Sequence, residues 1–553
     1  MNLPALFIAI LAYGSWIPPV LPGIPNIIFI FTDDQDLLHG SVDHQKAIQK
    51  HLAAEGTVFI THFATVAVCC PSRVSLMRGQ AAHNTNNTAI NTPGGGYPKF
   101  VASGENEKYL PHWLSKAGYK AKYIGKLFNG NSLLNYSPGP QGWRHIDVLL
   151  DPYINTYNTV VMSENGDRPT LYQGFHQSDV IMIKALARLQ KLLDEEDPFF
   201  LMIAPTAPHV ENLRDAPTLA KRHLDSFAKI KVPRTPNFNP GEEYQKQKPS
   251  WLRNLELLNS TQIAEIDHLH QRRVEALQSV DDIVEDVVTV LKDKDAIDNT
   301  YIIYSTDQGY HLGTHRHAGK LTPYREDTNI PLIVRGPGVH RGAVSNIPST
   351  VTDFAPTFLD IAGLAKRDQP SFLDGASGAI TNTELYNTLD DPYELKNLAN
   401  SGHTQIKRVK SRLNALLLVM KSCTKSTCRD PWSVIQPPSH LRKGKKVKTL
   451  DDALESKYDD YYSSFPLVTI DECLEYQYAP NERPFWPPEA EFGLGLEYRN
   501  PTDNFMYPDP EPVKKLAKND PLGGGWDQRN VTLEQLLSGS RDLTDEELEQ
   551  GSD

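Results

Sequence analysis

Two adjacent cysteines open the stretch CCPSRVSLMRG, Cys69 to Gly79, in a chain of 553 residues that contains five cysteines. One peptide bond separates their Cα atoms by about 3.8 Å, less than the usual separation across a disulfide. At least one thiol therefore needs another role. Pro71 and Ser72 predict a helix start, and a thiol there beside Arg73 has the setting of a reactive cysteine. Half of a disulfide to a distant cysteine and an inert buried thiol stay open as alternatives.

Oxygen-bearing side chains follow two apolar segments, 27–31 and 301–305. The first segment is followed by Asp33 and Asp34, and the second by Asp307 and Gln308. Unbroken β-rich runs of this kind predict buried parallel strands, and ligands bind beyond the carboxyl ends of such strands. We therefore expect the two strand ends to converge on one site. The alternative is that the Asp pair caps a following helix.

The segments around these residues alternate between helix and strand patterns. Apolar residues at helical spacing run from Val274 to Leu291 and end just before the second Asp-bearing strand, as expected of a helix that covers one face of a sheet. Further buried strands are expected over 198–205 and 330–338. This alternation predicts an α/β layered domain.

The composition is that of a globular protein with no general attraction to nucleic acid, because the net charge is −12 and 39% of the residues are hydrophobic. Residues 1–22 contain a short apolar run followed by small residues, which is typical of a signal peptide, although a buried first strand or helix is the alternative. No later segment has the length and apolar character of a membrane span. We expect secretion or a secretory-pathway or lysosome-like compartment, with candidate glycosylation sites at Asn86, Asn135, Asn259 and Asn530.

The character of the sequence changes near residue 365. We expect a large domain over 23–375, a shortened C-terminal subdomain over 376–480, and an extended or partly disordered tail over 481–553. The basic run from Arg442 to Lys448 is interpreted as a solvated loop, with binding of a sulfated polysaccharide as the alternative.

Two of the cysteines in the C-terminal part lie close together in the sequence. Cys423 and Cys428 close a small loop in an irregular segment, so we expect a disulfide between them in an oxidising compartment. This pairing leaves Cys70 and Cys473 unassigned.

The pattern Cys69-x-Pro-Ser-Arg, followed by Leu76, Met77 and Gly79, resembles the signature of the sulfatase family, in which the first cysteine is oxidised to Cα-formylglycine. The segments PNIIFIFTDDQD, GYKAKYIGKLFNG, APTAPHV, STDQGYHLGTHRHAGK and IPLIVRGPG resemble further motifs in family order. The resemblance covers about 25–398 and is closest to fungal arylsulfatases and N-acetylglucosamine-6-sulfatase-like enzymes. It implies an alkaline-phosphatase-like mixed sheet sandwiched by helices, with the catalytic domain over 23–375 and a smaller C-terminal region.

The resemblance also implies the cofactors. A formylglycine-generating enzyme would modify Cys69, while Cys70 occupies a free position of the motif. One Ca²⁺ ion would be held by Asp33, Asp34, Asp307, Gln308 and the modified residue 69, since oxygen ligands favour a hard cation. Gln308 stands where the family often has Asn. The ion would hold a sulfate oxygen and help to ionise the hydrated aldehyde.

Four further residues receive catalytic roles from the resemblance. Arg73 would steady the hydrated aldehyde, whose hydroxyl attacks sulfur. Lys126 and Lys320 match the sulfate-binding lysines, where cationic donors offset charge on the transferring group. His209 matches the histidine on the ester side and would assist the leaving group.

Three residues are candidates for substrate binding. Asn129 follows Phe128, which stands where the commonest family form has His, as in the glucosamine-6-sulfatase-like branch. His83 and His311 fall in matching motifs, and each is either a substrate contact or a buried structural histidine.

The implied activity is hydrolysis of a small aryl sulfate ester to a phenol and sulfate. One alternative is a glucosamine-6-sulfatase-like enzyme. A phosphonate or phosphodiester hydrolase of the same superfamily is another, because His311, His315 and His317 follow Asp307. An inactive, truncated secreted homologue is the third, because the chain has almost nothing between Ser377 and Glu384, where the family normally carries a substantial insertion.

Overall fold

The computed structural model describes residues 24–195, 197–212, 215–249, 251–370 and 384–468, together with Phe485 and Pro487. The expected signal peptide, the short segment between Ser377 and Glu384, Cys473, Asn530 and most of the expected tail lie outside these residues. Within the described ranges, no helix combines the length and the apolar character that crossing a lipid bilayer would need.

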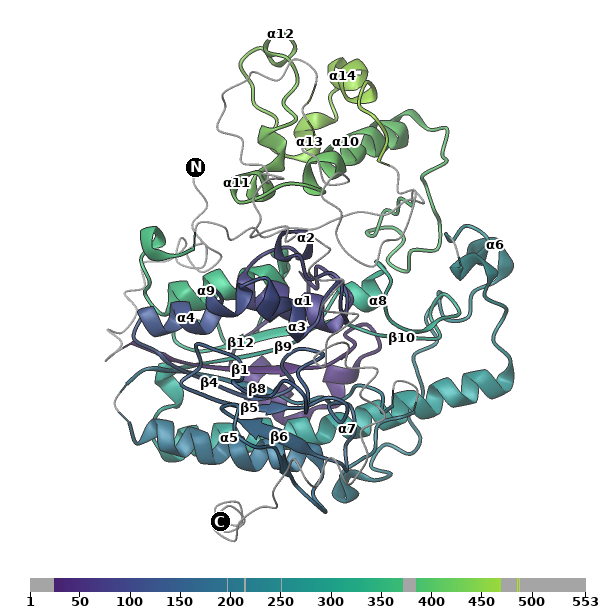
Figure 1. Cartoon of the computed structure of the whole chain (residues 1–553). Helices are drawn as coiled ribbons and strands as arrows, with labels where there is room; N and C mark the ends of the chain where they lie inside the picture. The colour runs from purple at the N-terminus through teal and green to yellow at the C-terminus, as the bar shows by residue number, and fades with distance from the viewer. Residues whose placement is uncertain are drawn as a thin grey trace.

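A ten-stranded mixed sheet forms the centre of the molecule, with the strand order β13-β2-β12-β9-β1-β8-β4-β5-β6-β7 (Figure 1). The strands are β1 (Asn26–Thr32), β2 (Thr57–Phe59), β4 (Lys120–Gly125), β5 (His145–Leu149), β6 (Val161–Glu164), β7 (Thr170–Leu171), β8 (Phe199–Ala204), β9 (Thr300–Thr306), β12 (Leu332–Arg335) and β13 (Ala343–Ser345). Strands β9, β1, β8, β4 and β5 are parallel, whereas β12 runs antiparallel to β9 and to β2. The predicted mixed α/β fold is confirmed.

Strand β1 shows why the centre of the sheet forms from its sequence. Its residues from Ile27 to Phe31 are completely buried. Successive side chains point to opposite faces, so that Phe29 and Phe31 join one apolar cluster while Ile28 and Ile30 join the other. Burial of each such side chain stabilises the fold by about 1.5–3 kcal/mol. A strand buried on both faces must be apolar throughout, which explains the unbroken run.

Helices cover both faces of this sheet (Figure 1). One face carries α1 (Cys69–Arg78), α3 (Tyr97–Ala102), α4 (Leu110–Lys116) and α9 (Phe354–Ile361), and the other carries α5 (Gln177–Leu193) and α7 (Ser260–Asp293). A capping box at Asn259 and Gln262 starts α7, whose apolar stripe packs under the sheet as the sequence predicted. The helix ends shortly before β9 begins.

Short elements connect the sheet to the loops at its carboxyl end. They are the strands β3 (His62–Phe63), β10 (His311–Leu312), β11 (Ala318–Gly319) and β14 (Ser349–Thr350), and the helices α2 (Ala82–Thr85), α6 (Glu242–Gln245) and α8 (Arg325–Thr328). Strands β10 and β11 pair antiparallel, and the chain between β9 and α8 therefore forms a hairpin.

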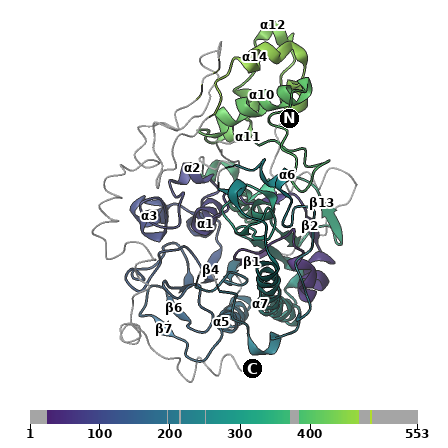
Figure 2. The ribbon, with the colours of Figure 1, turned by 90° about the vertical axis from the view of Figure 1, so that its right-hand side faces the viewer.

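The C-terminal part gathers at one end of the molecule, beyond α2 (Figure 2). It contains α10 (Thr404–Met420), α11 (Ser426–Arg429), α12 (Ser439–Arg442), α13 (Leu450–Ala453) and α14 (Asp459–Ser463), which pack around an apolar cluster of their own. Cys423 and Cys428 form a disulfide, the pairing expected from their spacing. The carbonyl oxygen of Cys423 accepts a hydrogen bond of 2.9 Å from Asn84 Nδ2, which ties this part to α2.

Candidate active site

The carboxyl ends of four neighbouring parallel strands supply most of the candidate site residues. In strand order, Asp307 follows β9, Asp33 follows β1, His209 follows β8 and Lys126 follows β4. Thr32 and Thr306 are in register, so the two acidic segments begin side by side. The main-chain nitrogen of Asp34 donates to Asp307 Oδ1 at 3.0 Å. The two strand ends converge, as the sequence predicted.

Cys69 begins α1 directly above these strand ends. Its Sγ lies 3.5 Å from Asp33 Oδ1 and 4.0 Å from Asp34 Oδ1. Lys320 Nζ lies 2.9 Å from the same sulfur, and Gln308 Nε2 lies 3.3 Å from it. The residue at the start of the helix therefore stands between acidic and cationic groups.

Arg73 joins three strand ends from one turn further along α1. Its Nε donates to Asp307 Oδ2 at 2.8 Å, and its Nη2 lies 3.7 Å from Asp33 Oδ1. The same guanidinium donates to the main-chain oxygens of Lys126 and Thr32 at 2.8 and 3.2 Å. Arg73 thus fixes the acidic residues relative to β4.

The two lysines pair with the first two aspartates. Lys126 Nζ forms an ion pair with Asp33 Oδ2, and both side chains are fully buried. Lys320 Nζ lies 2.6 Å from Asp34 Oδ1, and its side chain keeps 14% exposure, which marks the side of the site that faces solvent.

Burial and charge act against each other on the aspartates. Burial alone would raise the pKa of Asp33, but Lys126, His209 and Arg73 outweigh it and hold that pKa well below its ordinary value. The pKa of Asp34 is lowered in the same way, by Lys320 and His209 against burial. Burial raises the pKa of Asp307 to about 7 despite Arg73. Two of the three acids are therefore firmly anionic.

Burial governs the ionisation of the Cys69 thiol. Burial, and secondarily Asp33, raise its pKa to about 12. Lys126 and Lys320 act in the opposite direction but do not outweigh burial. An unmodified thiol at this position is therefore protonated at neutral pH.

His209 and Arg273 complete the surroundings of Asp34. His209 Nε2 lies 3.5 Å from Asp34 Oδ2, and its Nδ1 lies 2.6 Å from the Val210 carbonyl oxygen. Arg273, in α7, donates to the main-chain oxygens of Asp34 and Pro208. No motif of the sequence singles out Arg273, although a charged residue beside the apolar stripe that starts at Val274 is a signal for it.

The donor set at this site fits a divalent cation. Asp34 Oδ2 and Gln308 Oε1 are buried, and neither has a hydrogen-bond partner among the described residues. Ligand atoms of Asp33, Asp34, Cys69 and His209 lie within 4.8 Å of one another. Carboxylate and amide oxygens are the ligands of a hard cation. Asp33, Asp34, Asp307 and Gln308 are the residues that would hold it.

The three candidate substrate-binding residues do not form one group. Asn129 is buried, and its Oδ1 has no hydrogen-bond partner among the described residues. His83 lies in α2 with Nε2 at 3.3 Å from the Cys423 carbonyl oxygen. His311 is fully buried, and hydroxyls of Thr314 and Thr322 contact its ring nitrogens at 2.7 and 2.9 Å. These contacts favour the structural alternative for His311.

The glycosylation candidates differ in exposure. Asn86 and Asn135 are buried, and the Asn135 amide donates to the Gly130 carbonyl oxygen at 2.8 Å. A glycan needs an exposed amide, so the structure disfavours both positions. Asn259 is exposed at the start of α7.

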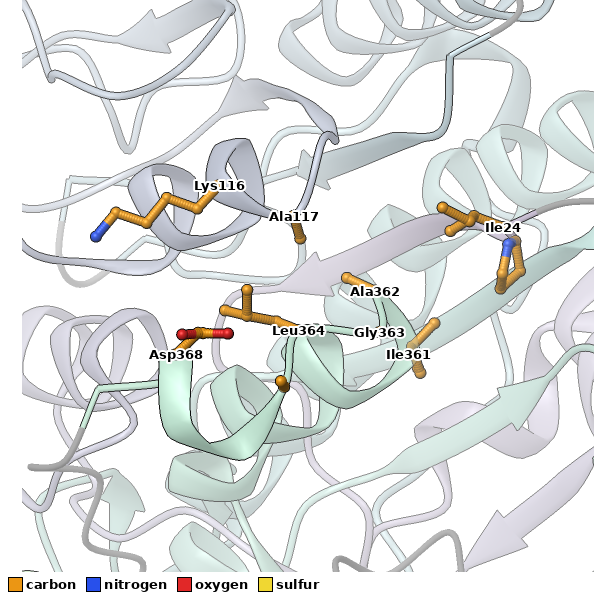
Figure 3. A pocket seen from close by; sticks show the side chains of 10 residues that line it. Ile24, Lys116, Ala117, Ile361, Ala362, Gly363, Leu364 and Asp368 are labelled. Atoms are coloured by element: carbon orange, nitrogen blue, oxygen red, sulfur yellow. The ribbon is translucent and has the colours of Figure 1, made fainter.

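A cavity of about 550 Å³ lies at the opposite end of β1 from this site. Figure 3 shows Ile24, Lys116, Leu364 and Asp368, which are among the residues that line it. Ile24 precedes the seven-residue strand β1, whereas Asp33 follows it. The cavity is therefore about one strand length, roughly 23 Å, from the aspartates.

Comparison with known proteins gives relatives along most of the chain. The family model described as Sulfatase matches residues 25–364. An arylsulfatase of Volvox carteri is 33% identical over 547 residues, which covers 83% of each chain. N-acetylglucosamine-6-sulfatase of Homo sapiens is 30% identical over 377 residues, which covers 65% of each chain.

Solved structures share the fold. A Bacteroides thetaiotaomicron protein from a study of glycosaminoglycan metabolism superposes with a TM-score of 0.57 and 16% identity, covering 74% of this chain and 98% of the other. A protein in complex with its substrate D-glucosamine-2-N,6-O-disulfate gives a TM-score of 0.53 and 23% identity, covering 68% and 94%. The family model matches more than half of the length of this chain, and the chain therefore belongs to the sulfatase family.

Proposed function

We propose that this sulfatase hydrolyses aryl sulfate esters to a phenol and sulfate, using a formylglycine made from Cys69 and one Ca²⁺ ion. The observation that carries the proposal is the position of Cys69 Sγ, 3.5 Å from Asp33 Oδ1 and 2.9 Å from Lys320 Nζ. A nucleophile at this position has acidic groups for a cation on one side and an ammonium group for a sulfate oxygen on the other. Both groups would stabilise the negative charge on a sulfuryl group during its transfer.

Formylglycine and Ca²⁺ would supply the chemistry of the reaction. Formylglycine, once formed by a formylglycine-generating enzyme, would supply a hydrated aldehyde whose hydroxyl is the nucleophile. Ca²⁺ supplies a Lewis acid, and Asp33, Asp34, Asp307 and Gln308 would hold it.

The residues of the chain bind and orient the ester. Lys320 places its charge within 2.9 Å of the sulfur atom of residue 69, so it can bind an oxygen of a sulfuryl group that approaches this residue. Lys126 adds a second buried ammonium group beside Asp33. Arg73 holds Asp33 and Asp307 in place. The two lysines, and not Arg73, bind the ester in this proposal.

His209 is proposed to deliver a proton to the leaving group, although burial lowers the pKa of its ring to about 4 against the effect of Asp34. A carbonyl oxygen only accepts, so Nδ1 must donate to the Val210 carbonyl. This bond fixes the tautomer and leaves Nε2 as the atom that takes up and releases a second proton. Nε2 faces Asp34 Oδ2 across 3.5 Å, within the site.

The comparisons support aryl sulfates as the first choice of substrate. The arylsulfatase of Volvox carteri aligns along 83% of the chain, whereas the human N-acetylglucosamine-6-sulfatase aligns along 65%. The second candidate is a glucosamine-6-sulfatase-like activity, which the buried and unpartnered Oδ1 of Asn129 favours as a polar contact for a sugar.

Matched substrates test the proposal. Initial rates with p-nitrophenyl sulfate, N-acetylglucosamine 6-sulfate and p-nitrophenyl phosphate are measured for the wild type and for Cys69→Ala. We expect the highest kcat/KM with the aryl sulfate and no turnover of any ester by the variant. Faster hydrolysis of the amino-sugar ester would favour the second candidate. Faster hydrolysis of the phosphate would favour a phosphohydrolase.

We also propose that the protein is secreted and glycosylated at Asn259. Curated relatives include extracellular sulfatase homologues of Caenorhabditis elegans and Drosophila melanogaster. Digestion of secreted protein with a peptide N-glycosidase should convert Asn259 to Asp in its tryptic peptide. Recovery of unmodified Asn259 alone would argue against this site.

A further inference from the structure

A second cluster of ligand-type side chains lies beside the segment that carries Lys320. His315 lies in the turn between β10 and β11, Glu326 lies in α8, and Glu394 lies in the chain after Glu384. One ligand atom of each of the three lies within 4.8 Å of the other two. We propose that His315, Glu326 and Glu394 bind a Zn²⁺ ion that is separate from the ion of the active site.

The imidazole of His315 is buried, and its polar atoms lack hydrogen-bond partners among the described residues. Its side chain has no exposed surface, and neither ring nitrogen has a hydrogen-bond partner among the described residues. The main chain is held at a positive φ of 51°, and its N–H donates to the Asn237 carbonyl oxygen at 2.8 Å. The ring is therefore fixed in a position where an unsatisfied imidazole destabilises the fold.

The two glutamates are oriented by one oxygen each. Glu326 Oε1 accepts from Asn237 Nδ2 at 2.6 Å, and Glu394 Oε2 accepts from the main-chain nitrogen of Arg325 at 3.2 Å. Glu326 Oε2 is buried and has no hydrogen-bond partner among the described residues. A carboxylate oxygen and an imidazole, both without hydrogen-bond partners among the described residues, thus lie close together. This arrangement is suited to binding a metal ion.

Lys248 and Arg325 carry the positive charges that act on Glu394. Lys248 Nζ is already engaged by the Tyr386 hydroxyl at 2.9 Å and the Glu394 carbonyl oxygen at 2.5 Å. Burial and then Glu326 raise the pKa of Glu394 to about 7, although Lys248 and Arg325 act in the opposite direction. A divalent cation would supply the missing charge.

The donor set distinguishes this cluster from the active site. One imidazole and two carboxylates match the ligands of Zn²⁺. The active site offers mainly carboxylate and amide oxygens, which favour Ca²⁺. An ion bound to His315 and Glu394 would fasten the chain after Glu384 to the loop that positions Lys320.

A third cluster provides a matched control. His145, Asp147 and Glu164 also bring ligand atoms within 4.8 Å of one another. Here Lys184 lies 3.0 Å from Asp147, and Arg188 lies 2.8 Å from Glu164. These cations offset the charge of the carboxylates, so we expect no metal ion in this cluster.

The test uses the full-length protein, stripped of metal with a chelator and then titrated with ZnCl₂. Thermal unfolding and the zinc retained after gel filtration are measured for the wild type and four variants. We expect the wild type to retain about one Zn²⁺ from this site and to unfold at a higher temperature when zinc is bound. His315→Gln and Glu394→Gln should bind zinc at least about tenfold more weakly. Asp34→Asn, which alters the active site, and His145→Gln should keep the wild-type response.

Three outcomes would overturn the proposal. In the first, the wild type retains no zinc and shows no shift in unfolding temperature. In the second, His315→Gln and Glu394→Gln respond as the wild type does. In the third, Asp34→Asn alone abolishes the response, which would place the zinc in the active site. If His315→Gln does not fold, the wild-type measurement and Glu394→Gln decide, because Glu394 lies at the edge of the cluster with 9% exposure.

Discussion

The two neighbouring cysteines face different regions of the molecule. Cys69 faces the charged groups at the end of the sheet, with its Sγ 3.5 Å from Asp33 Oδ1. Cys70 belongs to the apolar cluster above the sheet, and its Sγ lies 3.5 Å from Asn87 Oδ1. Burial raises the pKa of both thiols to about 12. Acidity therefore does not separate them, and the surrounding groups decide which cysteine is suited to catalysis.

Removal of Cys69 is the strongest way to test this difference. We expect Cys69→Ala to reduce kcat for p-nitrophenyl sulfate by at least about 10⁵-fold, because the covalent step disappears. The unfolding temperature should change little, since the substitution removes one sulfur atom. Kinetic assay and thermal unfolding of the same preparation check both parts. Substantial turnover by the folded variant would exclude residue 69 as the nucleophile.

Removal of the metal ion tests the charged region without changing its sequence. Dialysis against a calcium chelator should abolish hydrolysis of p-nitrophenyl sulfate, and added Ca²⁺ should restore it, because Asp34 Oδ2 and Gln308 Oε1 are free to bind a cation. Rates are measured before dialysis, after it and after addition of Ca²⁺ or Zn²⁺. Full activity in chelator would contradict a catalytic metal ion, and rescue by Zn²⁺ alone would contradict Ca²⁺.

Arg73→Lys tests the geometry of the charged region. Lysine keeps the charge but loses the planar fork that joins Asp307 to the carbonyl oxygens of Lys126 and Thr32. Small displacements of catalytic groups are costly, so kcat should fall about tenfold to a hundredfold. KM should change less, because Arg73 does not bind the ester in this account. An unchanged kcat would show that the other contacts suffice to position the acids.

Cys70→Ala should have the smallest effect. The substitution leaves a small cavity in the apolar cluster and should lower the free energy of unfolding by about 1 kcal/mol. Most of the activity should remain, because Cys70 makes no contact with the acids or the lysines. Denaturant unfolding and kinetic assay measure the two effects. A loss of activity as large as that of Cys69→Ala would contradict the distinction between the two cysteines.

The centre of the fold was predictable because its sequence pattern is local. The buried runs of β1, β8 and β9 and the apolar stripe of α7 follow from side-chain burial on both faces of one sheet. The short outer strands β6 and β7 were not predicted, since a few residues of moderate β propensity form a strand only when a neighbouring strand pairs with them.

The site was predictable only in part. Asp33, Asp34 and Asp307 were identified from their positions after apolar strands, whereas Lys126 and Lys320 depended on the resemblance, because an isolated lysine is usually a surface charge. Arg273 was missed because its partners lie more than 60 positions away in the sequence. The cluster at His315 depends on contacts with Glu394 that no local pattern reveals.

The mass of the peptide that contains residue 69 tests the central claim most directly. Protein purified with activity towards p-nitrophenyl sulfate is digested, and the peptide across Cys69 and Cys70 is fragmented by mass spectrometry. The account predicts an aldehyde, formylglycine, at position 69 and an unmodified thiol at position 70. An active enzyme with an unmodified thiol at 69, or with formylglycine at 70, would contradict it.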